Sequence, residues 1–238
     1  MTELATLAGL GVLASAAVLG VTHGFEPDHA AGISALTSDA DGWLHAALVG
    51  ASFAVGHVVV VLVWLAGLRA LGGTLSAVPG VAETVGTVVP AVVLSGVALL
   101  LATTGLRRVR GRSPHPHRGE TDGPVGWVLA RVHHRLHGHD HETAGDYLRT
   151  GVVGSAFALS PPVSMLALVS AVLPTAGAAL TLSAVAVYAV GLTLSMVVVG
   201  AGLAGAFGVA GRRSRHAHGT LEVAAGVVVF GFAVRLLV

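Results

Sequence analysis

Long apolar blocks without charged residues dominate this sequence and restrict the folds open to it. Hydrophobic residues make up 54% of the 238 positions and charged residues only 11%, whereas a soluble domain has about 25% charged residues. Runs of about 20 apolar residues are typical of membrane-spanning helices, while a transmembrane barrel needs short alternating segments. The sequence therefore predicts an all-α polytopic membrane protein with about six transmembrane helices, at about residues 4–36, 43–68, 83–106, 149–173, 177–209 and 218–237.

The first segment, 4–36, is too long for one straight span. About thirty helical residues measure about 45–50 Å, against a hydrocarbon core of about 30 Å. The segment contains the sequence His23-Gly24-Phe25-Glu26-Pro27-Asp28-His29. A proline removes one helical hydrogen bond and clashes with the carbonyl four residues earlier. The sequence thus predicts a broken or re-entrant helix at this motif, with the carbonyl of His23 released from the helix.

An offset of 135 residues aligns several features of the two halves of the chain. Pro27 then meets Pro162, where a second helix break is expected, and small residues coincide at several further positions. Two three-helix units, 1–106 and 149–238, would be oppositely oriented because an odd number of crossings inverts the second unit. Inverted repeats with broken first helices are a recurrent plan of membrane transporters. Residues 107–148 form the linker between the units.

The distribution of arginine along the sequence predicts how the chain is oriented in the membrane. It is concentrated in the linker 107–148 and in the loop at 212–215, which lie on one side of a six-span arrangement. The positive-inside rule places that side in the cytoplasm and both termini outside a cell membrane crossed several times. The linker also holds seven of the thirteen histidines, between His115 and His141. This composition is typical of metal binding, unless the linker is a solvated loop in which histidine is incidental.

The ionisable residues of the first segment indicate a functional site, because such groups are costly inside a membrane. Imidazole and carboxylate together suit Zn, Ni, Co, Fe or Mn, and the chain has no cysteine to supply thiolate ligands. On an ideal helix His23 lies about 140° from Asp28 and about 240° from His29. A site shared by these three residues therefore requires the helix break at Pro27.

The metal-site hypothesis extends to His57 and Glu26 but not to Glu222. His57 is the only ionisable residue in the hydrophobic stretch around it, and is either a satisfied interior residue or another ligand. Glu26 either orients an imidazole or lines the entrance to the site. Glu222 lies at a span end, where contact with water is expected. The candidate metal ligands are therefore His23, Asp28, His29 and His57.

These residues carry a resemblance to a known family. His23-x4-Asp28-His29 matches the HX4DH signature of the nickel/cobalt transporter family, and Phe53-Ala54-Val55-Gly56-His57 is similar to the Gly-His helix that follows it in that family. The three-span repeat also resembles a wider lysine-exporter-like clan that includes urease-accessory membrane proteins. The resemblance covers about the first 65 residues and implies that the four candidate ligands recognise metal. The chain departs from classical members in having fewer spans and Val58-Val59 in place of Ser-Thr.

We therefore expect a secondary transporter whose substrate is Ni²⁺ or Co²⁺ and whose surroundings are the lipid bilayer, not an enzyme and without a cofactor. A net charge near zero gives no indication of nucleic acid binding. One alternative is a membrane accessory protein that passes metal to a partner without transporting it. Another is a His-box membrane metalloenzyme, for which the cluster His133–His141 is the only candidate site.

Overall fold

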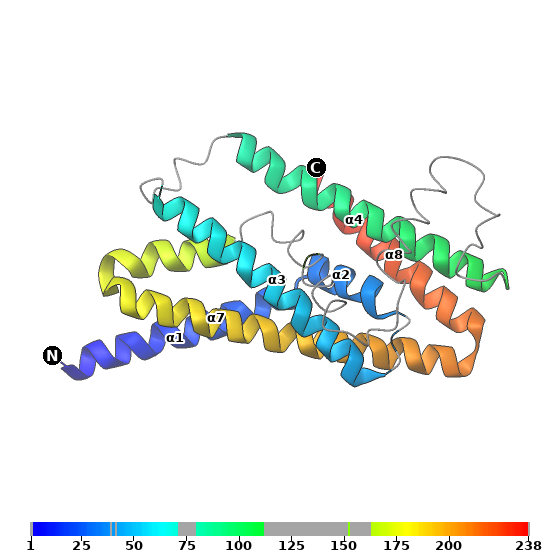
Figure 1. The fold of residues 1–238 in the computed structure, drawn as a ribbon, viewed down its shortest axis with the longest axis horizontal. Coiled ribbons are helices and arrows are strands. Elements are labelled where there is room, and N and C mark those ends of the chain that lie inside the picture. The colour runs from blue at the N-terminus through cyan, green and yellow to red at the C-terminus, as the bar shows by residue number, and fades with distance from the viewer. Residues whose placement is uncertain are drawn as a thin grey trace.

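The computed structural model describes residues 2–38, 40, 42–70, 80–111, 152 and 163–237. Its helices pack side by side into an elongated bundle (Figure 1). They are α1 (Thr2–Gly24), α2 (Pro27–Thr37), α3 (Trp43–Ala70), α4 (Gly80–Val109), α7 (Val163–Arg213) and α8 (Arg215–Leu237). The predicted all-α architecture is confirmed.

Five helical stretches of the described residues are long and apolar enough to cross a membrane. They confirm the expected polytopic class and are Thr6–Gly24, Trp43–Val63, Pro90–Val109, Ala171–Arg213 and Arg215–Leu237. The predicted span at 149–173 lies mostly outside the described residues, as does the linker beyond residue 111. The expected second break at Pro162 and the cluster His133–His141 also lie outside them, so both stay predictions.

The helix α7 is sharply bent at Gly177. This glycine has φ 77° and ψ 177°, which interrupts the helical backbone, and only glycine adopts a positive φ of this kind without steric cost. In Figure 1 the first part of α7 runs toward one end of the bundle, and the second part, residues 178–213, returns along it. The bend therefore separates a short helical segment from a long membrane-spanning one.

Three helix pairs hold the bundle together. The second part of α7 packs parallel to α1 and antiparallel to α3, while α4 and α8 form an antiparallel pair, and α2 lies among them. Each pair has a glycine where a Cβ atom would collide with the facing backbone carbonyl: Gly20 against Tyr188, Gly50 against Met196, and Gly105 against Gly219. Small residues let membrane helices approach to backbone contact, which strengthens their packing.

A buried ion pair joins α4 to α8. Arg108 donates from Nε to Oε2 of Glu222 across 2.9 Å, and His218 Nε2 lies 3.6 Å from Oε1 of the same carboxylate. Glu222 is only 1% exposed, so the expectation that it contacts water is wrong. The reason is tertiary: the close approach of the two helices at Gly105 covers the first turns of α8 with α4.

Helix boundaries and buried positions recur at the offset seen in the sequence. Gly42 and Gly177 both have positive φ, of 125° and 77°, and each directly precedes a long helical segment. Helix α4 begins at Gly80 and α8 at Arg215, again 135 residues apart. The same offset relates buried positions of α4 to buried positions of α8: Ala91, Leu94 and Ala98 to Gly226, Val229 and Ala233. The two-unit organisation stays a prediction, with which these boundaries agree.

Candidate metal site

The site is built on the break between α1 and α2. Helix α1 ends at Gly24 and α2 begins at Pro27, as the proline predicted. Glu26 has an extended backbone, φ −60° and ψ 145°, which redirects the chain. Pro27 occupies the first turn of α2, where its missing N–H leaves no helical hydrogen bond unmade. The carbonyl of His23 is not free, contrary to expectation, because it accepts a hydrogen bond from the backbone N–H of Glu26 across 3.0 Å.

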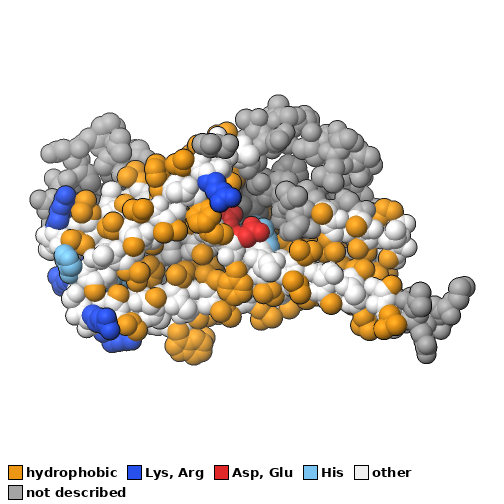
Figure 2. Space-filling view, turned by 180° about the vertical axis from the view of Figure 1, so that it is seen from behind, with side chains coloured by type: hydrophobic (Ala, Val, Ile, Leu, Met, Phe, Trp, Pro, Cys, Tyr) orange, Lys and Arg blue, Asp and Glu red, His pale blue; other side chains and the backbone are white. Residues whose placement is uncertain are grey.

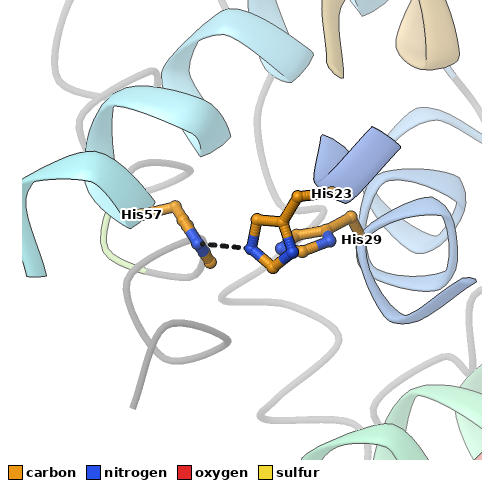
Figure 3. Close-up of side chains that lie close together, drawn as sticks. All are labelled: His23, His29 and His57. Atoms are coloured by element: carbon orange, nitrogen blue, oxygen red, sulfur yellow. Dashed lines mark hydrogen bonds between the residues drawn. The ribbon is translucent and has the colours of Figure 1, made fainter. Parts of the chain in front are cut away.

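Three histidines from three helices meet beside this break (Figure 3). His23 comes from the end of α1, His29 from the first turn of α2 and His57 from the middle of α3. Their ring centroids are 4.7 Å apart for His23 and His29, 4.8 Å for His29 and His57, and 5.4 Å for His23 and His57. All three side chains are buried. The break thus unites side chains that one continuous helix would point in different directions.

Three of the six ring nitrogens in this cluster are buried without a hydrogen-bond partner. Both ring nitrogens of His29 and Nδ1 of His57 are buried and unpaired, although nearly all buried polar atoms in proteins are hydrogen-bonded. His23 Nε2 lies 3.4 Å from His57 Nε2. Two nitrogen ligands of a tetrahedral metal ion, each at about 2.0–2.1 Å, are themselves about 3.4 Å apart. One nitrogen pair of the cluster therefore has the spacing of two ligands on a metal ion, and the nitrogens of His29 and His57 that lack partners retain lone pairs for a ligand.

Two carboxylates flank the three rings. Glu26 Oε1 lies 3.0 Å from His23 Nδ1, the kind of contact through which a carboxylate orients a metal-binding imidazole. Asp28 Oδ1 accepts a hydrogen bond from the backbone N–H of His29 across 2.8 Å. The same oxygen is 3.1 Å from His29 Nδ1, an ion-pair distance, although His29 Nδ1 makes no hydrogen bond. Asp28 therefore lies at the edge of the site, against one histidine rather than among all three.

Aromatic side chains lie against the rings of two of the histidines. The ring of Phe53 stands edge-on to His29 at 6.3 Å, and the ring of Tyr188 lies 6.0 Å from that of His23. Both aromatic residues are almost completely buried. Sequence reasoning missed their roles. Phe53 precedes His57 by four residues, which places both on one face of α3, but no sequence signal links Tyr188 to a motif more than 150 residues away.

The structure brings all four predicted ligands to one place. His23, His29 and His57 present ligand atoms within 4.8 Å of one another, and Asp28 belongs to a second such group with Glu26 and His29. The chain matches no family model, curated protein or solved structure. The likeness to the nickel/cobalt transporter family therefore remains a resemblance that the quoted motifs carry.

Proposed function

We propose that this protein is a secondary transporter that carries a divalent transition-metal ion, nickel or cobalt, across a membrane. The observation that carries the proposal is the cluster of His23, His29 and His57, whose buried ring nitrogens lack partners inside a bundle of apolar helices. An unpaired polar atom costs stability when it is buried. A ligand that engages these nitrogens offsets that cost.

The position of the cluster supports a transport role. His57 lies near the middle of α3, and Gly24, beside His23, packs against Leu192 and Ser195 near the middle of the second part of α7. The cluster is thus about halfway along the membrane-spanning helices. Secondary transporters commonly bind their substrate near the bilayer midplane, where broken helices end.

The donor atoms favour borderline transition metals. Imidazole nitrogen suits nickel, cobalt, zinc and iron, whereas magnesium and calcium prefer sites made of oxygen. The protein contains no thiol to select monovalent copper. Protons compete with the metal for imidazole lone pairs, because a ligand nitrogen must be deprotonated. A proton gradient is therefore a chemically suitable partner for moving the ion.

The test compares total nickel and cobalt in cells that express wild type, His29→Ala or His216→Ala at equal membrane levels. His216 is exposed on α8 and lies outside the cluster, so its variant is a matched control for the loss of one imidazole. Uptake predicts more cell metal with wild type and the control, and export predicts less metal with greater tolerance. Equal metal content with wild type and His29→Ala contradicts the proposal.

A flux assay with the purified protein separates transport from a metal-storing or accessory role. Wild type in vesicles loaded with a cobalt-quenched dye should quench the dye on addition of Co²⁺, and His29→Ala should quench no faster than empty vesicles. Binding of Co²⁺ by wild type without any quenching would show a metal-binding membrane protein that does not transport.

A further inference from the structure

We infer that Glu26, Asp28 and His29 form an outer metal station from which an ion passes to the inner cluster of His23, His29 and His57. The inference rests on the proposed function and adds to it a second binding position and an order of loading. Its ligand is a partly hydrated divalent cation, which two carboxylates and one imidazole are suited to hold.

The two groups share His29. Ligand atoms of Glu26, Asp28 and His29 lie within 4.8 Å of one another, as do those of the inner cluster. His29 Nδ1 is 3.1 Å from Asp28 Oδ1 and makes no hydrogen bond. The side chain of His29 is only 1% exposed, so an almost completely buried and unpaired nitrogen borders the carboxylates. One imidazole therefore contacts both positions, which allows an ion to move between them without release.

Exposure decreases from the outer station to the inner cluster. The side chain of Glu26 is 50% exposed and that of Asp28 is 32% exposed, whereas that of His23 is 8% exposed. Among acidic residues whose side chains the structure describes, Glu26 and Asp28 are the two that reach the surface. Figure 2 shows a small acidic patch with a histidine on one side and a basic side chain on the other, in the middle of a face that is mostly apolar or uncharged and has further basic side chains at one end.

The outer station contains two carboxylates and the inner cluster only imidazoles, a difference that suits stepwise loss of the waters bound to the ion. Two carboxylates outside attract a hydrated cation and hydrogen-bond the waters that it retains, while the inner imidazoles bind the ion once it has lost those waters. A charged side chain at membrane depth faces water or a partner. The exposed side of Glu26 is thus where an aqueous path meets the site.

Both tests use the full-length protein with its seven linker histidines, between His115 and His141, changed to alanine, because such a His-rich tract is typical of metal binding and would add its own signal. In this background, the first test measures how fast Co²⁺ associates with the purified protein in detergent, with Glu26 intact or changed to Gln. Glutamine keeps an oxygen close to His23 Nδ1 but removes the negative charge.

We expect association to slow by about 10-fold, because a charge at the mouth of a site raises the local cation concentration. Dissociation should slow as well, because the ion leaves through the same station, so Kd should change much less than the association rate. Thr22→Val is the matched control, since the Thr22 hydroxyl donates to the carbonyls of Val18 and Leu19 in its own helix. Unchanged association in Glu26→Gln overturns the inference.

The second test isolates the outer station by removing two inner ligands. The double variant His23→Ala/His57→Ala should still bind one Co²⁺ per chain, about 100-fold more weakly, with the pale absorption of an octahedral ion. Adding Glu26→Gln should abolish this residual binding. No residual binding, or residual binding indifferent to Glu26→Gln, overturns the outer station. If the single variant His57→Ala instead bound Co²⁺ as tightly as wild type, that result would contradict the proposed function itself.

Discussion

His23 Nε2 and His57 Nε2 lie 3.4 Å apart, although 34 residues separate the two histidines in the sequence. The contact joins the end of α1 to the middle of α3, in surroundings that leave His57 Nδ1 without a partner. A buried imidazole of this kind gains little from the protein alone. Stability without metal and affinity for metal should therefore respond in opposite ways to changes at these positions.

Replacing His57 with leucine should separate the two properties. The substitution removes the unpaired nitrogen Nδ1 and fills similar space, but it also removes the 3.4 Å contact of Nε2 with His23. Because these two effects oppose each other, the metal-free free energy of unfolding should change by less than about 1 kcal/mol. Wild type should gain about 2.7 kcal/mol of stability from Co²⁺ at 100 times its Kd, whereas the variant, left with the weaker outer station, should gain only about 0.4 kcal/mol at the same Co²⁺ concentration. Unfolding in detergent with and without Co²⁺ measures both effects. A large loss of metal-free stability would show that His57 has a structural partner instead.

Replacing Pro27 with alanine should weaken metal binding through the backbone. The substitution allows the helix to continue from α1 into α2, and an uninterrupted helix separates His23 from His29 by about 240°. We expect Co²⁺ affinity to fall by at least about 10-fold, as when groups that orient metal ligands are lost. Pro174→Ala is the control, because Pro174 lies exposed inside α7. Equal Co²⁺ titrations for both variants would show that the break does not depend on Pro27.

Two glycines of α1 should differ sharply in their tolerance of alanine. A Cβ at Gly20 would collide with the backbone carbonyl of Tyr188, whereas at Gly11 it would meet no atom within 4 Å. Gly20→Ala should lower the free energy of unfolding by about 1–3 kcal/mol through overpacking, and Gly11→Ala should change it by less than about 0.5 kcal/mol. Unfolding of both variants in detergent is the measurement. Similar stabilities would contradict the tight contact between α1 and α7.

The ion pair between Arg108 and Glu222 should reveal its burial through a double-mutant cycle. Arg108→Met leaves an uncompensated buried carboxylate and should destabilise the protein by about 3–5 kcal/mol. The double variant Arg108→Met/Glu222→Met should be more stable than this single variant, because it removes both charges together. Arg110→Met, at an exposed position just beyond α4, should have little effect. A double variant no more stable than Arg108→Met would show that the two side chains do not interact.

Local features of this protein followed from its sequence. The apolar blocks predicted helices of membrane-spanning length because backbone groups inside a bilayer must be hydrogen-bonded within their own segment. Pro27 predicted the break because proline acts on the turn in which it lies. The grouping of His23 with His29 followed from these two facts, since the break removes the angular separation that a helix would impose.

Only the tertiary structure decided how distant segments meet. The role of His57, as a ligand or a satisfied interior residue, was open until α3 packed beside the break. The contact of Tyr188 with His23 had no predictive signal in the sequence. Asp28 took a place at the edge of the site because its oxygen is held by the backbone of His29.

The burial of Glu222 shows the same division between local and tertiary information. Its position near a span end predicted contact with water, but α4 covers it and Arg108 neutralises it. Helix type depends on residues within a few turns of one another, so the sequence by itself determined it. Helix contact depends on small residues such as Gly105 and Gly219 meeting across more than 100 positions, so only the folded protein decided which polar groups became a site and which became a buried pair.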